Sequence, residues 1–332
     1  YYFSYYLRSS IMIKIAIIGA GLSGITFAHL LQDYADITLF EKARGVGGRM
    51  STRRAEPYFF DHGTQYFTAR TKCFQDFIQT LIGKGIIERW NARYLKFIGN
   101  QIIEKRNWLD EEPRYVGVPG MSHIAKFLAQ GLNIHCNKRI TSLNRQGTWQ
   151  LIDEEGQQSQ GFDWVICTAP PPQAVDLLPD SFKYHADIQV IKMRSCFSLM
   201  LGFEQSLPLD FEAAHVTDSD LSWIAVNSHK PQRPDLFTLT VHSSEDYAEA
   251  HIDDDRDQVI KHLINETSHI IGQDVSQANY KNIHGWRYAN NADKKQKSSV
   301  FIDQDLKLAA CGDWCLGGRV EGAFTSAYNL TK

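Results

Sequence analysis

The stretch Gly19-Ala20-Gly21-Leu22-Ser23-Gly24 has the spacing G-x-G-x-x-G, which can bring a polypeptide backbone close to phosphate groups. The first glycine makes a tight turn, the second lets the backbone approach a pyrophosphate, and the third lets a helix pack closely on a strand. Glu41 ends the next strand-like run and could accept hydrogen bonds from a ribose diol. The motif therefore predicts a bound dinucleotide without distinguishing NAD from FAD. The structural alternative is a glycine-rich turn that binds nothing.

A second cluster of glycine and arginine follows directly after Glu41. The loop that begins at Lys42 contains Arg44 and then Gly47-Gly48-Arg49. An arginine can hold pyrophosphate oxygens with a forked pair of hydrogen bonds. An NAD dehydrogenase does not need a second set of phosphate-binding glycine and arginine residues at this place, whereas the longer FAD molecule needs more backbone along its length. The loop favours FAD, and the alternative is a solvated basic loop.

A third stretch, CGDWCLGGRVEGAF (311–324), places an aspartate and several glycines between and after two cysteines. A metal site would need a second cysteine pair or histidines at ligand spacing, and the sequence has neither. We therefore predict no metal. The chain has six cysteines scattered in mostly apolar surroundings, which is typical of reduced thiols and predicts a cytoplasmic protein.

Length and composition restrict the class of protein. A chain of 332 residues exceeds the usual single core, and 43% hydrophobic residues with a net charge of −3 describe a globular protein. The charge gives no reason to expect a nucleic-acid partner, and no apolar run is long enough to predict a membrane span. Residues 1–11 lack the features of a secretory signal, and we expect them to be a leader or disordered.

The elements that must position these motifs can be read from periodicity. A buried strand is expected at 13–21, a helix at 22–34 and a second strand at 35–41, which together form a βαβ unit. Further helices are expected at 71–85, 118–132, 254–271 and 322–330, with short strands between them. The fold predicted is α/β, with a Rossmann-like FAD-binding domain and an inserted, mainly antiparallel α+β substrate domain. The expected FAD-binding domain comprises 12–70, 119–178 and 296–332, and the substrate domain comprises 71–118 and 179–295.

Four blocks in this order, GAGLSG, FEKARGVGGRMSTRR, FDHGTQYFTAR and CGDWCLGGRVEGAFTSA, resemble the bacterial renalase-like flavoproteins of the FAD-dependent amine-oxidase superfamily. The resemblance runs through nearly all of Met12 to Lys332 and is weak between 180 and 280. Because the blocks agree in order and spacing, they are far more specific than a single glycine motif.

The resemblance implies a set of FAD contacts. The first glycine motif would contact the pyrophosphate and Glu41 the adenosine ribose. Asp61, Gly63 and Thr64 of the block FDHGTQYFTAR would pass beside the flavin ring. Asp313 would hold the ribityl or phosphate end, and the first amides of the last helix would face the flavin. The predicted cofactor-binding residues are Gly19, Ala20, Gly21, Leu22, Ser23, Gly24, Glu41, Lys42, Arg44, Gly48, Arg49, Asp61, Gly63, Thr64, Gly312, Asp313, Val320 and Glu321.

The substrate pocket is expected to contain aromatic residues and a few polar groups, because FAD itself carries the redox chemistry. The residues predicted for it are Gln65, Tyr66, Trp223, His242, Trp286 and Tyr288. For the last four the alternative is a core aromatic or a histidine satisfied within the fold. Lys192 could correspond to the lysine found near the flavin in many amine oxidases, but its surroundings match a solvated strand edge better.

The resemblance implies an oxidase that takes a hydride from a dihydronicotinamide donor, an isomer of NAD(P)H reduced at the 2 or 6 position of the ring. The electrons would pass to O2, giving H2O2 and NAD(P)+. The partners expected are thus a small-molecule substrate and O2. Two alternatives stay open, namely an FAD-dependent amine oxidase acting on a small amine and a flavin-binding protein without turnover.

Overall fold

The computed structural model describes residues 12–293 and 298–332, so the prediction for residues 1–11 lies outside the described residues. The chain divides into two compact units. The first contains the described residues up to Gly48 together with Ala125–Met193 and those of Asn291–Lys332, and the second contains Arg49–Ile124 and Arg194–Asn290. The predicted domain boundaries differ from these units mainly at 49–70, which the second unit includes. A compact unit need not coincide with a cofactor-binding domain, so those boundaries stay a prediction.

The first unit is built on a six-stranded sheet, counted over the described residues, in the order β19-β20-β13-β1-β2-β9. Its strands are parallel except for β19, which pairs antiparallel with β20. Their bounds are β1 (Ile13–Ile18), β2 (Ala35–Glu41), β9 (Asn133–Cys136), β13 (Trp164–Cys167), β19 (Phe301–Asp303) and β20 (Leu308–Ala310). The sequence of β1 is almost wholly apolar because the strand is buried on both faces of the sheet. The expected Rossmann-like βαβ unit is confirmed.

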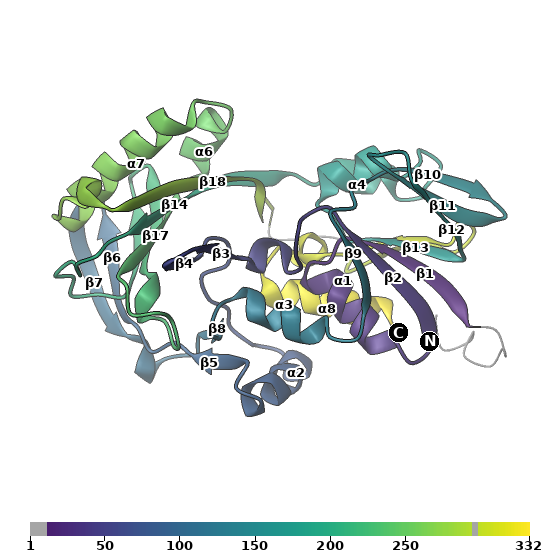
Figure 1. The fold of residues 1–332 in the computed structure, drawn as a ribbon, viewed down its shortest axis with the longest axis horizontal. Helices are drawn as coiled ribbons and strands as arrows, with labels where there is room; N and C mark the ends of the chain where they lie inside the picture. The colour runs from purple at the N-terminus through teal and green to yellow at the C-terminus, as the bar shows by residue number, and fades with distance from the viewer. Residues whose placement is uncertain (1–11, 294–297) are drawn as a thin grey trace. The chain divides into compact units, whose positions relative to one another are not determined.

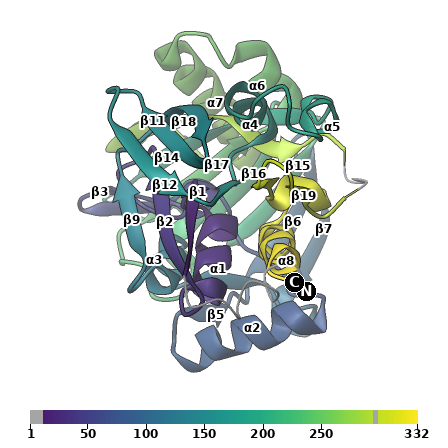
Figure 2. The same cartoon turned by 90° about the vertical axis from the view of Figure 1, so that its right-hand side faces the viewer.

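Two helices lie side by side in this unit, α1 (Leu22–Leu31) and α8 (Val320–Leu330) (Figures 1 and 2). They are joined where the Ser23 hydroxyl donates to the Ala323 carbonyl across 2.9 Å. A short 3₁₀ helix, η6 (Asp313–Leu316), precedes α8. The unit is completed by a three-stranded sheet and two helices, namely β10 (Ile140–Gln146), β11 (Thr148–Asp153), β12 (Gln158–Phe162), α4 (Pro171–Leu177) and α5 (His185–Gln189).

The second unit is built on a seven-stranded sheet, again counted over the described residues, in the order β18-β14-β17-β16-β15-β6-β7. The pairs β14–β17, β17–β16, β16–β15 and β6–β7 are antiparallel and β15–β6 is parallel, in agreement with the predicted mainly antiparallel domain. Its strands are β6 (Arg93–Ile98), β7 (Gln101–Asn107), β14 (Met193–Gly202), β15 (Ala213–Thr217), β16 (Leu221–Val226), β17 (Thr238–Ser243) and β18 (Tyr280–Asn291).

Helix α7 (Arg256–Ile271) covers one face of this sheet (Figure 1). Its apolar residues Val259 and Leu263 are buried in the same core as Ile224 and Val241 of the sheet. Asp255 caps the helix by accepting two backbone N–H groups, and the helix ends at the left-handed Gly272. The remaining elements of the unit are β3 (Thr52–Ala55), β4 (Tyr58–Asp61), α2 (Lys72–Gly83), β5 (Ile87–Arg89), η3 (Trp108–Asp110), β8 (Tyr115–Gly117), η4 (Asn227–His229), α6 (Glu245–His251) and η5 (Val275–Gln277). The short helices η2 (Gly48–Met50) and α3 (Ser122–Leu128) have residues in both units.

None of the helices in the described part of the chain combines the length and apolar character needed to cross a membrane. All six cysteines are free thiols. Lys192 lies just before β14 rather than within it, and it is exposed.

Candidate functional site

The glycine motif forms the turn between β1 and the start of α1. Gly19 has a φ of 105°, a left-handed conformation that glycine adopts without strain. A Cβ atom on Gly24 would lie 2.1 Å from the Gly19 carbonyl oxygen, so only glycine allows helix and strand to pack this closely. A Cβ atom on Gly21 would meet no atom within 4 Å. Open space therefore lies in front of the helix N-terminus, whose N-cap provides no side-chain hydrogen bond.

The Glu41 carboxylate is fixed beside this turn. It accepts backbone N–H groups from Ala20 at 2.8 Å and Ala43 at 2.7 Å, one on each oxygen. Each carboxylate oxygen can accept a further hydrogen bond, so Glu41 keeps capacity for a hydroxyl group. The second glycine loop lies next to the first, because Gly21 and Gly47 form a parallel bridge and the Gly47 amide donates to the Ala20 carbonyl.

The other predicted cofactor residues of this unit fall into two groups. Lys42, Arg44 and Gly48 are exposed, and Lys42 donates to Gln173 at 2.9 Å. Gly312 and Asp313 are buried in the turn before α8, where the Gly312 amide donates to the Ser326 hydroxyl at 3.0 Å. Helix α8 begins at Val320 and, like α1, has no side-chain cap at its N-terminus. These glycine turns and uncapped helix ends fit an FAD molecule, which would be held by them and by Glu41.

The cysteines of the last motif are enclosed in the core. Cys311 and Cys315 have no exposed surface, and burial raises the pKa of both thiols well above the ordinary value. Buried thiols of this kind are unreactive because the thiolate form is disfavoured. Among the residues that the structure describes, no group of histidine, cysteine, aspartate or glutamate side chains could hold a metal ion.

In the second unit, the segment after β4 carries the predicted residues from Asp61 to Tyr66. Gly63 packs against the Arg49 carbonyl oxygen, which a Cβ atom would approach to 2.0 Å. The Thr64 amide and hydroxyl both donate to that same oxygen. Arg49 itself donates from Nη1 to the Ala289 carbonyl at 3.1 Å.

Asp61 is fully buried, and both of its oxygens are occupied by protein groups. Oδ1 accepts from the Thr52 hydroxyl at 2.8 Å and the Met121 amide at 2.9 Å. Oδ2 accepts from Arg233 at 2.6 Å and Lys230 at 3.4 Å. Burial alone would raise the pKa of Asp61, but the charges of Lys230 and Arg233 outweigh it and hold the pKa well below its usual range. The carboxylate therefore has no exposed atom for a ligand, and the expected passage of this segment beside the flavin stays a prediction.

Four of the six predicted pocket residues come together in this unit. Gln65 Nε2 lies 3.3 Å from His242 Nε2, and Trp223 is the cross-strand neighbour of His242. The Tyr66 ring lies 5.5 Å from the Trp223 ring and 5.1 Å from that of Trp108. These four residues, Gln65, Tyr66, Trp223 and His242, are referred to below as the Gln65 cluster.

Trp286 belongs to a different group. Its indole N–H donates to the His62 carbonyl at 2.8 Å, and its ring stacks on His62 and packs edge-on against His284. Burial, with a contribution from His284, lowers the pKa of His62 to about 3. The described contacts do not connect Tyr288 with the other predicted pocket residues.

Sequence reasoning missed Lys230 and Arg233, the partners of Asp61. Lys230 is 2% exposed and also donates to Gln65 Oε1 at 3.1 Å. Burial lowers the pKa of Lys230 to about 8, although the Asp61 charge opposes this shift. The run His229-Lys230-Pro231-Gln232-Arg233 looks like a surface loop in the sequence. The only signal was the aspartate in an apolar strand, which requires a cationic partner when buried.

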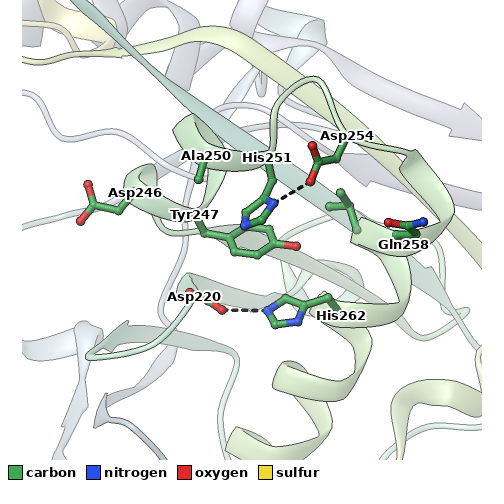
Figure 3. A pocket seen from close by; sticks show the side chains of 9 residues that line it. Asp220, Asp246, Tyr247, Ala250, His251, Asp254, Gln258 and His262 are labelled. Carbon is green, nitrogen blue, oxygen red and sulfur yellow. Dashed lines mark hydrogen bonds and ion pairs between the residues drawn. The ribbon is translucent and has the colours of Figure 1, made fainter.

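An open surface pocket of about 510 Å³ lies elsewhere in the second unit, around Tyr247 of α6 (Figure 3). His262 bonds to Asp220 and His251 to Asp254, each across 2.7 Å, while the Tyr247 ring stacks on His262. No residue predicted from the sequence lines this pocket. Its histidines and two of its aspartates already bond one another.

Comparisons with known proteins agree with the geometry. Residues 94–330 match the family of flavin containing amine oxidoreductases, and residues 17–81 match the NAD(P)-binding Rossmann-like domain. Renalase from Mus musculus is 25% identical over 217 residues, which cover 60% of this chain and 60% of that protein. The match thus spans less than two thirds of the relative's length.

Two solved structures share the fold. A protein provisionally assigned as a protoporphyrinogen oxidase from Exiguobacterium sp. 255-15 aligns with a TM-score of 0.76 at 14% identity, covering 97% of this chain and 98% of that one. A variant of putrescine oxidase aligns with a TM-score of 0.70 at 11% identity, covering 96% and 98%. The match over 94–330 covers most of the chain. The chain therefore belongs to the flavin-containing amine oxidoreductase family.

Proposed function

We propose that the protein is an oxidase for dihydronicotinamide donors, namely the isomers of NAD(P)H reduced at the 2 or 6 position of the ring. The overall reaction is donor plus O2 plus a proton giving NAD(P)+ and H2O2. The donor loses a hydride and becomes aromatic, and O2 takes up two electrons and two protons. Bound FAD supplies the two-electron acceptor between them. The similarity to renalase and the composition of the Gln65 cluster support this assignment.

The observation that carries the proposal is a buried positive charge in contact with the side chain of Gln65. Among the residues that the structure describes, Asp61 is the carboxylate that pairs with Lys230 and Arg233, so this group of three has an excess of one positive charge. An amine substrate is cationic at neutral pH and would be repelled by such a charge at short range. A dinucleotide donor has a neutral dihydronicotinamide ring and negative phosphates, so it meets no such repulsion.

The side chains of the Gln65 cluster suit a flat, neutral ring. Tyr66 and Trp223 are aromatic and pack on each other, and Trp223 is also buried in the core that contains Trp108. Aromatic rings of this kind stack well on another planar ring. Burial, together with the charge of Lys230, lowers the pKa of His242 to about 4, so this histidine is neutral at physiological pH. Hydride transfer from a dihydronicotinamide needs no general base, whereas an alkylammonium must first lose a proton. The chain's contribution is therefore to bind and orient the donor.

A reductive half-reaction tests the proposal. The FAD-loaded protein is mixed without oxygen with 2- and 6-dihydro isomers of NAD(P)H, with ordinary NADH, and with a panel of small amines. We expect the isomers to bleach the oxidised flavin rapidly and the amines to leave it unchanged. Readmission of O2 should restore the flavin and release one H2O2 per donor. Bleaching by amines alone would overturn the proposal, and no bleaching by any compound would favour a flavin-binding protein without turnover.

A further inference from the structure

The side-chain amide of Gln65 is held in one orientation. Its Nε2 donates to the carbonyl oxygens of Asp61 at 2.6 Å and Gly63 at 2.9 Å, while its Oε1 accepts from Lys230 Nζ at 3.1 Å. A flipped amide would set an oxygen against two carbonyl oxygens and an NH2 group against an ammonium group. Both amide hydrogens are therefore committed to backbone carbonyls.

This orientation determines which nitrogen of His242 carries the proton. His242 Nε2 lies 3.3 Å from Gln65 Nε2, and an amide nitrogen donates but does not accept. A hydrogen on His242 Nε2 would point at another donor, so Nε2 must be bare and the hydrogen must sit on Nδ1. The lowered pKa of His242, about 4, keeps the ring neutral so that it holds a single proton. Among the described residues Nδ1 has no hydrogen-bond partner, and the residue is only partly buried.

Lys230 is in turn immobilised by its surroundings. It has almost no exposed surface, it lies 3.4 Å from Asp61 Oδ2, and its ammonium group lies over the Trp90 ring at 5.3 Å. Arg233 Nη2 donates to the same Asp61 oxygen across 2.6 Å. The ammonium group is therefore enclosed by Asp61, Gln65 and Trp90, away from water.

We infer that Lys230 and Gln65 are positioning residues that hold His242 as the Nδ1–H tautomer, and that this N–H selects the electron donor by binding a carbonyl oxygen on its ring. The inference rests on the proposed function, because the dihydronicotinamide ring carries a carboxamide with such an oxygen. Trp223 lies beside His242 on the neighbouring strand. The contact discriminates between ring substituents without taking part in hydride transfer.

The tautomer is tested by nitrogen NMR on FAD-loaded protein labelled with ¹⁵N-histidine, with His242→Asn used to assign the signal. We expect a protonated Nδ1 and a bare Nε2 in the wild type. Gln65→Met should let the ring populate both tautomers, because nothing then opposes a hydrogen on Nε2. Lys230→Met removes one of the three hydrogen bonds that orient the Gln65 amide and should weaken the preference for the Nδ1–H tautomer to a smaller extent. Gln65→Met keeps the Lys230–Asp61 pair and so covers the case in which Lys230→Met does not fold. His269→Asn, an exposed position on α7, serves as the matched control and should leave the His242 signal unchanged.

The ligand contact is tested separately by the binding of three oxidised dinucleotides, followed by the change in flavin absorbance. The first carries a carboxamide, the second an acetyl group, which keeps the carbonyl oxygen, and the third an unsubstituted pyridine ring. We expect the wild type to bind the first two about tenfold more tightly than the third, the size of one good hydrogen bond. His242→Leu should abolish that preference. His242→Asn should retain part of it, because an asparagine amide can donate from nearly the position of Nδ1.

The two measurements separate the inference from the function on which it rests. A proton on Nε2 in the wild type overturns the positioning by Lys230 and Gln65. A preference that survives in His242→Leu overturns the carbonyl contact. If the wild type shows the Nδ1–H tautomer but binds none of the dinucleotides, the proposed donor class is wrong and the carbonyl contact falls with it, while the positioning stands.

Discussion

At the scale of single residues, the largest revision concerns Asp61. The sequence places it in a flavin-family block, which implies a contact with the cofactor. The structure uses both of its oxygens for Thr52, Met121, Arg233 and Lys230. Breaking a buried ion pair by removing one partner typically costs about 3–5 kcal/mol, because the remaining charge is left uncompensated. The Asp61 carboxylate thus orients Lys230 and Arg233 next to Gln65, while a contact of this segment with FAD stays a prediction.

Asp313 and Cys315 give a residue-scale prediction about FAD affinity. Asp313→Asn preserves the shape of the turn before α8 but removes the charge, and we expect FAD to bind about tenfold or more weakly, as for the loss of a hydrogen bond to a charged group. Cys315→Ser should keep its flavin, because the side chain is buried in the core and the Ser326 hydroxyl offers it a hydrogen-bond partner. The measurement is the FAD dissociation constant of each refolded apoprotein. Equal affinities for the two variants would remove Asp313 from the cofactor site.

At the scale of elements, α1 and its glycine turn combine two requirements that substitutions can separate. Gly24 is needed for the helix to pack on β1, since a Cβ atom would meet the Gly19 carbonyl oxygen. Gly21 has an extended conformation open to any residue, with φ at −73° and ψ at 179°, and a Cβ atom there would enter free space. The fold therefore requires a glycine at position 24, whereas a glycine at position 21 would be required only by the bound ligand.

This difference predicts opposite outcomes for two matched substitutions. Gly24→Ala should destabilise the apoprotein by roughly 2–4 kcal/mol, since helix and strand must move apart. Gly21→Ala should leave apoprotein stability within about 0.5 kcal/mol of wild type and weaken FAD binding at least tenfold, because the methyl group occupies the space in front of the α1 N-terminus. Denaturant unfolding of the apoprotein and titration with FAD distinguish the two effects. Unchanged FAD affinity in Gly21→Ala would place the pyrophosphate elsewhere.

The features that the sequence predicts correctly are those encoded by residues close together in the chain. The βαβ unit, Glu41 and the final helix depend on residues close in the chain, and the structure confirms these elements. Lys230 and Arg233 could not be predicted, because their partner Asp61 lies 169 and 172 residues away and no periodic pattern connects them. Trp223 and His242 were chosen as single aromatic and polar residues in strands. That they face Gln65 and Tyr66 depends on the register between β16 and β17, which a single sequence does not reveal.

At the scale of the whole molecule, the distribution of charge matters more than its sum. The net charge of −3 is small, yet the second unit buries a carboxylate with two cations and keeps several histidines neutral. Burial, assisted by Arg53, also lowers the pKa of His284 to about 4. Neutral histidines in a folded protein make its stability depend on pH, because the unfolded chain takes up protons that the folded chain does not.

The direction of this dependence follows from the pKa values. The pKa of His62 is about 3 in the folded protein, against about 6.5 in an unfolded chain, so its stabilising effect is complete above pH 6.5 and is lost as pH falls from there toward 3. The pKa of Asp61 is also lowered, from about 3.9 when unfolded, so its effect is lost only at still lower pH. Between pH 7 and 4.5 the buried histidines therefore determine how steeply the free energy of unfolding changes with pH.

We expect the free energy of unfolding of the FAD-saturated protein to fall between pH 7 and 4.5, with His62 alone contributing on the order of 2 kcal/mol. His62→Gln should flatten the slope by that amount, because glutamine does not titrate. Asp61→Asn should instead lower stability throughout this range while leaving the slope nearly unchanged, since the carboxylate stays ionised across it. Denaturant unfolding at a series of pH values measures both. A slope that His62→Gln leaves intact would show that His62 has the same pKa in the folded and the unfolded protein, so that its burial against Trp286 does not keep it neutral.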